Sequence, residues 1–234
     1  MPRRPLFSQS VALLKHATPF ATGTASLCYV HPDNPDLCLK VQKPEKLHKR
    51  NFLRRLPSAI YHYTENVKNA DAYRQKAVRH GGARIWEHLP RLHGWQNTDI
   101  GLGLVSDYYS TPDGRPAPTL RGLLHAHGMT RELNLAIADF TDFLHDMQVL
   151  TRRINLRNLV YARDGRLKLI DDVGSTGVMF ADMYKGLGKR RIRRNIRDIH
   201  KRIAWELSDR SHPWDKWQAE TTGRWLPAFD RLDF

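Results

Sequence analysis

Cysteine, long apolar runs and acidic side chains are all scarce in this sequence. Its two cysteines, Cys28 and Cys38, lie in apolar stretches and lack the spacing of a metal site, so we expect free, buried thiols. No apolar run approaches the roughly 18–20 residues that a membrane span needs. The N-terminal region also lacks the apolar segment of a signal peptide. These absences favour a protein of the reducing cytoplasm.

The shortage of acidic residues leaves the chain strongly positive. It has 38 Lys and Arg against 24 Asp and Glu, a net charge of +14. This charge favours an anionic partner, which could be a nucleotide, a nucleic acid or a phosphate-rich membrane surface. A hydrophobic content of 41% over 234 residues supports one large folded domain or two small lobes.

Short apolar runs and periodic patterns predict the elements. Hairpins are expected where the runs 27–30 and 37–41, and then 158–161 and 167–170, flank turn-forming residues. Apolar periodicity predicts helices, which cover 61–79, 131–150 and 190–207. Strands therefore come first and helices later, broken by a short hairpin. That order indicates an α+β fold.

Lys40 is the first residue that suggests phosphoryl-transfer chemistry, which needs a cation for the nucleotide phosphates. It lies inside the apolar run Leu-Cys-Leu-Lys-Val, where a lysine is costly to bury unless it is paired or used. A solvent-facing lysine on a half-buried strand is the alternative. The preceding loop contains Gly23, Thr24 and Ser26, which could approach a phosphate; with a single glycine, an ordinary turn explains it equally well.

Asn158 and Asp171 form the stronger pattern. Asn158 opens the second hairpin and Asp171 closes it, so the thirteen-residue interval places both at one end. Two such oxygen ligands suit magnesium, although a turn asparagine and a strand-end aspartate are also common structural residues. Asp172 begins an Asp-x-Gly sequence and is the alternative ligand. We favour Asp171 because it ends the apolar run.

Together these segments resemble the YrbL family, which is named for the PhoP regulatory network and placed in the protein-kinase-like superfamily. The resemblance covers residues 18–178. It rests on the short segments 23–32, 37–41, 89–94, 98–105, 113–120, 158–161 and 171–175. It implies a bilobal protein-kinase-like fold with an antiparallel N-terminal sheet and a reduced helical C-lobe.

The sequence and the resemblance together suggest boundaries. The residues themselves indicate a short basic leader over 1–17, with a helical turn at 11–15. The N-lobe would cover 18–105, and the C-lobe would cover 106–234 and include a basic C-terminal helix.

Carried over by position, the resemblance implies an ATP and Mg²⁺ site. Lys40 would bind phosphate, with Glu65 as its helix partner and Asp71 as the alternative partner. Asp107 would lie in the hinge, 105–109, beside the adenine. Gly23, Thr24 and Ser26 would face the nucleotide, and Asn158 and Asp171 would hold the metal.

One departure concerns the reaction. Where ordinary kinases have an aspartate five residues before the metal-binding asparagine, this chain has Arg153, which stays protonated and cannot act as a base. Phosphoryl transfer could need no base here, or Asn155 or Asp172 could orient the acceptor. Alternatively, the domain is a nucleotide-binding pseudokinase that acts as a sensor or scaffold.

Residues 185–202 contain nine Lys or Arg residues opposite a stripe of isoleucines. The solvated face of a packed helix would explain this, and so would a surface that attracts an anionic acceptor or a membrane leaflet. RNA would also be attracted, but no nucleic-acid motif accompanies the charges. We expect ATP- and Mg²⁺-dependent transfer to a small or envelope-derived lipid or sugar acceptor, because little chain after Gly174 remains for a peptide platform. The expected location is the cytoplasm, with peripheral contact at the inner membrane.

Overall fold

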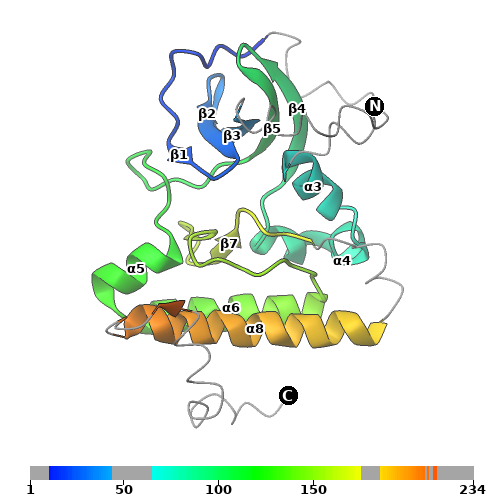
Figure 1. Cartoon of the computed structure of the whole chain (residues 1–234), viewed down its shortest axis with the longest axis vertical. Coiled ribbons are helices and arrows are strands. Elements are labelled where there is room, and N and C mark those ends of the chain that lie inside the picture. Colours follow the sequence, from blue (N-terminus) through cyan, green and yellow to red (C-terminus); the bar gives the residue numbers. More distant parts are fainter. Residues whose placement is uncertain (1–10, 44–64, 175–184, 209, 211–212, 215–234) are drawn as a thin grey trace.

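A five-stranded antiparallel sheet and a group of helices form the molecule (Figure 1). The computed structural model describes residues 11–43, 65–174, 185–208, 210 and 213–214. The strands of the sheet are β1 (Ala21–Thr22), β2 (Ser26–His31), β3 (Asn34–Gln42), β4 (Leu92–Thr98) and β5 (Gly101–Asp107), in the order β1-β2-β3-β5-β4. The α+β class predicted from the sequence is confirmed.

The first predicted hairpin is formed by β2 and β3. Alternation along β3 turns Leu37, Leu39 and Val41 into a small hydrophobic cluster on one face of the sheet. Lys40 therefore lies on the opposite face, where it pairs across the strands with Cys28 on β2 and Leu104 on β5. Period-two alternation thus places the lysine on the face that does not contribute to this cluster.

The expected helical turn at 11–15 is wrong. Ala12 instead forms a parallel bridge with Thr98 at the end of β4, and its backbone N–H donates to the Asn97 carbonyl at 3.0 Å. Leu14 is 2% exposed and belongs to the small cluster of the sheet. An edge strand offers unpaired backbone groups, and pairing with them outweighs the local helical preference.

Six helical segments lie among the described residues. They are α3 (Glu65–Ala72), α4 (Lys76–His80), the 3₁₀ helix η2 (Gly82–Glu87), α5 (Leu120–His127), α6 (Arg131–Met147) and α8 (Lys185–Leu207). The predicted helix over 61–79 is divided into α3 and α4, and 61–64 lie outside the described residues. The break falls at Gln75, whose buried side chain donates to the Leu150 carbonyl at 3.2 Å and accepts from its N–H at 2.7 Å. No helix among the described residues is long and apolar enough to cross a membrane.

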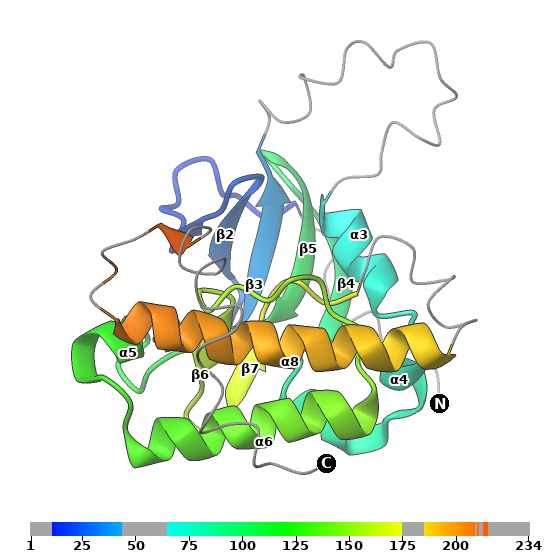
Figure 2. The same ribbon diagram turned by 60° about the horizontal axis from the view of Figure 1, so that its bottom comes forward.

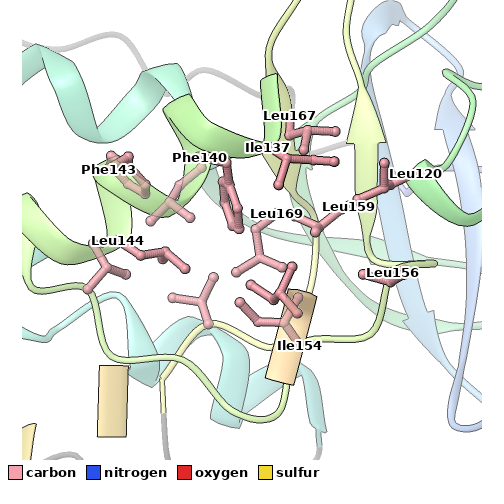
Figure 3. Close-up of a cluster of buried hydrophobic side chains, with 14 of the residues drawn as sticks. Leu120, Ile137, Phe140, Phe143, Leu144, Ile154, Leu156, Leu159, Leu167 and Leu169 are labelled. Carbon is pink, nitrogen blue, oxygen red and sulfur yellow. The ribbon is translucent and has the colours of Figure 1, made fainter. Parts of the chain in front are cut away.

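The larger hydrophobic cluster joins the helices to a second hairpin, β6 (Leu159–Tyr161) and β7 (Leu167–Leu169). Figure 3 shows Phe140 of α6 near Leu169 of β7, with Phe143 on the other side of Phe140. The predicted stripe on α6 is buried as expected, but the helix ends at Met147, because Gln148 adopts a left-handed conformation with φ 53°. The predicted second hairpin is confirmed, and the last helix begins five residues earlier than expected.

Helix α6 begins at a capping threonine that allows a direct test. The Thr130 hydroxyl accepts a hydrogen bond from the Leu133 N–H at 3.3 Å. We expect Thr130→Ala to lower the free energy of unfolding by about 1 kcal/mol, because the amide loses its partner. Thr130→Ser keeps the hydroxyl and should stay close to the parent in urea titrations. Equal losses in both variants would contradict the capping role.

Candidate functional site

An ion pair between Lys40 and Asp171 joins the sheet to the hairpin region. The Lys40 Nζ lies 2.7 Å from the Asp171 Oδ2, although 131 residues separate the two in sequence. Lys40 comes from the centre of β3, and Asp171 follows β7 directly. The side chains are 17% and 30% exposed, so a ligand in solution can reach both. The structure therefore brings two of the sequence-predicted residues into one place.

The environment of Asp171 stabilises its charged form. Burial alone would raise the pKa of this carboxyl, but the charge and hydrogen bond of Lys40, the Asp172 amide and the charge of Arg152 outweigh it. The pKa therefore lies below the usual value of 3.8. The Asp171 Oδ1 accepts the Asp172 N–H at 2.9 Å, and an Arg152 nitrogen lies 3.7 Å from it. Each carboxylate oxygen has a further lone pair for a ligand.

Asn158 lies beside Asp172 rather than donating to Asp171. The Asn158 amide donates to the Asp172 Oδ2 at 2.6 Å, and the Asn155 N–H approaches the same oxygen at 3.4 Å. Burial and the charge of Asp171 raise the pKa of Asp172, despite opposing hydrogen bonds from Asn158 and Asn155 and the charge of Arg152. Asp172 also has a left-handed backbone, with φ 66°. Two neighbouring carboxyls therefore have pKa values shifted in opposite directions.

Backbone pairing holds the loop before Asn158 against the aspartates. The Arg152 N–H donates to the Asp172 carbonyl at 2.7 Å, and Thr151 forms an antiparallel bridge with Val173. Behind this loop, the buried Asn195 of α8 donates to the carbonyls of Thr151 and Arg152 at 2.9 and 3.1 Å. Sequence reasoning missed Asn195, because an asparagine inside a basic helix has no distinctive pattern.

Helix α3 contributes amides to the site. Asn66 donates to the Lys40 carbonyl at 2.7 Å, and Asn69 accepts from Arg152 at 2.6 Å. The predicted helix partner, Glu65, begins α3, but its side chain lies outside the described residues. The alternative, Asp71, lies 3.6 Å from Arg74 instead. None of these three residues was predicted. The i, i+3 spacing of Asn66 and Asn69, which places both on one face of a helix, is the signal that could have found the asparagines.

The other predicted nucleotide residues differ in accessibility. Gly23 and Thr24 are exposed in the connection between β1 and β2. Ser26 is 3% exposed, and its hydroxyl donates to the Asn66 side-chain oxygen at 3.3 Å. Asp107 accepts the Arg91 N–H at 2.8 Å and lies 2.6 Å from His93, so its carboxylate already has internal partners. Of these predicted nucleotide residues, Gly23 and Thr24 are therefore the most accessible to a ligand.

Arg153, at the position expected for a catalytic aspartate, lies over Trp214. Its guanidinium carbon is 5.8 Å from the centre of that ring, and the guanidinium carbon of Arg202 is 4.3 Å from it. Cations near an aromatic face at these distances are attracted by the ring quadrupole. The contact connects the loop at 151–158 with the C-terminal part of the chain.

The two cysteines lie on the same face of the sheet as Lys40. Cys28 is opposite Lys40, and Cys38 is two residues before it on β3. Both are free and half-buried, as expected for unpaired thiols. Burial raises the pKa of Cys28 to about 12, and burial likewise raises the pKa of Cys38. The thiols are therefore protonated at neutral pH and chemically unreactive.

The donor set is compatible with a magnesium ion. Among the described residues, no group of three or more His, Cys, Asp or Glu side chains forms a metal-binding cluster. A cation would depend on Asp171 and the Asn158 amide, with Asp172 as the alternative carboxylate and the remaining ligands from water or phosphate. Mg²⁺ usually binds in that way, through one or two carboxylates and substrate oxygens.

Comparisons with known proteins match most of the chain. The family described as "PhoP regulatory network protein YrbL" matches residues 12–204. Proteins described as "Uncharacterized protein YrbL" from Escherichia coli (strain K12) and Shigella flexneri are each 24% identical to the chain over 172 residues. The aligned region covers 70% of this chain and 73% of each relative.

Proposed function

We propose that this chain, which belongs to the PhoP regulatory network protein YrbL family, is a protein-kinase-like phosphotransferase dependent on ATP and Mg²⁺. The observation that carries the proposal is the 2.7 Å pair between Lys40 on the sheet and Asp171 after the second hairpin. A strand lysine and a metal-binding aspartate in contact are the parts that hold nucleotide phosphates in this chemistry.

Each residue has a role in this proposal. Lys40 holds the nucleotide phosphates, and the exposed backbone at Gly23 and Thr24 covers them. Asp171 and the Asn158 amide hold Mg²⁺, which when bound neutralises phosphate charge. Asp172 orients the acceptor. Its raised pKa suits a general base better than the pKa of an ordinary carboxylate does. Asn155 positions it through the contact between its N–H and the Asp172 carboxylate.

The acceptor in this proposal is small, and the protein acts in the cytoplasm. Helix α8 has nine Lys or Arg against two Asp or Glu, which favours an anionic acceptor. We therefore favour a lipid- or sugar-derived acceptor from the cell envelope. Robust phosphorylation of a peptide would contradict this choice.

A second candidate is a nucleotide-binding pseudokinase that acts as a sensor or scaffold. The observation that favours it is the contact of Arg153 with Trp214, which uses the expected catalytic position for packing. A basic RNA-binding protein is a third and weaker reading, and the net charge of +14 is its main support.

A thermal-shift titration with ATP, with and without Mg²⁺, tests the nucleotide site. A ligand at about 100 times its Kd contributes about 2.7 kcal/mol, which is roughly 5–10 °C in Tm for a chain of this size. We expect Asp171→Asn to remove the Mg²⁺-dependent part of the shift, because a neutral amide binds the cation less well. Asp142→Asn, on the exposed side of α6, is the matched control and should respond like the parent.

The outcomes separate the candidates. A Mg²⁺-dependent shift with transfer of the γ-phosphate supports the phosphotransferase. The same shift without transfer to any acceptor class favours the sensor. No shift with any nucleotide contradicts both and leaves the basic surface as the functional feature.

A further inference from the structure

Half of the net charge of the chain is concentrated on helix α8. Its 23 residues contain nine Lys or Arg and two Asp or Glu, a net of seven positive charges against +14 for the whole chain. A helix that needs only solubility usually mixes both signs on its surface. The concentration of one sign on one element indicates attraction to a polyanion.

The charges lie on a defined face of α8. Its inner face, with Ile192, Ile199 and Ile203, is buried in the larger hydrophobic cluster. The outer face carries the cation row, by which we mean the exposed residues Lys189, Arg190, Arg193, Arg194 and Arg197. Figures 1 and 2 place α8 on the side of the molecule away from the five-stranded sheet.

The cation row has no acidic partners among the described residues. Several cations elsewhere are paired, such as Lys40 with Asp171 and Arg121 with Glu206. On α8, by contrast, burial and then the charge of Arg194 lower the pKa of Arg191. Neighbouring cations thus repel one another, and an external anion would relieve that repulsion.

A groove lies beside the cation row. It has a volume of about 490 Å³ and is formed between the C-terminal end of α6 and the first half of α8. Lys189 and Arg193 line it together with His145, Asp146 and Gln148. A phosphate-bearing head group would meet two cations of the row there. The surface therefore has both the exposed cation row and a groove beside it.

We propose that the cation row of α8 docks the protein on an anionic phospholipid bilayer. The row is spread along a rigid helix whose apolar face is already buried, so the contact is electrostatic and the helix does not insert. A bilayer fits better than RNA, because the part of α8 that carries the row, residues 189–197, contains no aromatic residue to stack on a base. The nearby Trp205 and Trp214 pack edge-to-face on each other, with ring centres 5.9 Å apart.

Sedimentation of the full chain with vesicles tests this docking. The probes are phosphatidylcholine vesicles with and without phosphatidylglycerol, at about 0.1 M and about 1 M salt, where the Debye length falls from about 10 to about 3 Å. The triple variant Arg190→Gln, Arg194→Gln and Arg197→Gln should bind the anionic vesicles roughly 100-fold more weakly. Its control, Lys76→Gln, Arg79→Gln and Arg131→Gln, removes the same charge from exposed positions elsewhere and should lose much less.

Three results would overturn the proposal. Equal binding to neutral and anionic vesicles would exclude charge as the cause, and equal losses in the two triple variants would show a diffuse effect of net charge. Tighter binding of poly(U) RNA than of anionic vesicles, lost in the α8 variant, would assign the row to nucleic acid. The docking is independent of the nucleotide site, so the ATP and Mg²⁺ response of the α8 variant should match the parent whatever the vesicles show.

Discussion

Replacing Lys40 with methionine is expected to weaken nucleotide binding by about 10- to 150-fold and to destabilise the fold. The estimate follows from a charge-assisted hydrogen bond worth about 1.5–3 kcal/mol. In the absence of nucleotide, the same side chain stabilises the partly buried carboxylate of Asp171 across 2.7 Å. Methionine fills similar space without charge, so the free energy of unfolding at pH 7 should fall by about 1.5–3 kcal/mol.

The pH dependence of this loss identifies its cause. In the parent, the pKa of Asp171 is below 3.8, so its stabilising contribution is present above pH 3.8 and is lost as pH falls through the lower folded value. Without Lys40, the largest opposition to burial is lost and only the Asp172 amide and Arg152 remain, so the pKa of Asp171 should be higher in the variant than in the parent. As pH falls, the variant carboxylate is therefore protonated first, and the parent then loses its advantage as its own carboxylate is protonated. The difference between parent and variant should narrow from pH 7 to about pH 4.

Urea titrations at several pH values measure both effects. Lys76→Met is the matched control, because Lys76 is exposed on α4 and forms no ion pair with a described residue. It should leave the nucleotide response unchanged and give a small difference that does not depend on pH. A Lys40→Met deficit that is constant from pH 7 to 4 would show that the pair with Asp171 does not cause it.

Glu206→Ala replaces a buried side chain and should lower the free energy of unfolding by about 3–5 kcal/mol. The Glu206 side chain is 3% exposed, yet it lies 2.8 Å from Arg121 and 2.6 Å from His125, both on α5. It therefore connects the C-terminal end of α8 to α5. Its removal leaves the partly buried guanidinium of Arg121 without its anion, and the expected fall in Tm is roughly 6–20 °C.

An exposed ion pair provides the comparison for Glu206. Asp146 lies 3.2 Å from Arg84, and the two side chains are 50% and 46% exposed. Pairs of this kind contribute about 0–1 kcal/mol, so Asp146→Ala should shift Tm only slightly. If calorimetry gave similar shifts for both alanine variants, burial would not distinguish the two pairs.

Local turn chemistry and periodicity predicted two hairpins and the helices α6 and α8. The β2–β3 and β6–β7 hairpins follow from Asx, proline and glycine residues between short apolar runs, and α6 follows from its stripe. The break at Gln75 was not predictable, because the Leu150 backbone that its side chain binds is 75 residues away. The bridge of Ala12 to Thr98 depends in the same way on a distant strand edge.

The site residues also fall into those that local sequence predicted and those that it did not. Lys40 and Asp171 stood out in the sequence because charged residues interrupt or end apolar runs there. Asn66, Asn69 and Asn195 carry the supporting hydrogen bonds, but asparagine is common in loops and on helix surfaces. An asparagine supports the site only if the fold places it beside the site residues. The residues next to it in the sequence do not show that placement.

The boundary between the two hydrophobic clusters determines how easily the parts can separate. The small cluster of the sheet and the large cluster of the helices share no residues, and Lys40 forms polar contacts from the sheet to Asp171 and Asn66. Opening along this boundary would exchange these polar contacts for water. Each of them has a net worth of only about 0.5–3 kcal/mol, so the polar contacts alone oppose separation far less than the packing of either cluster opposes unfolding.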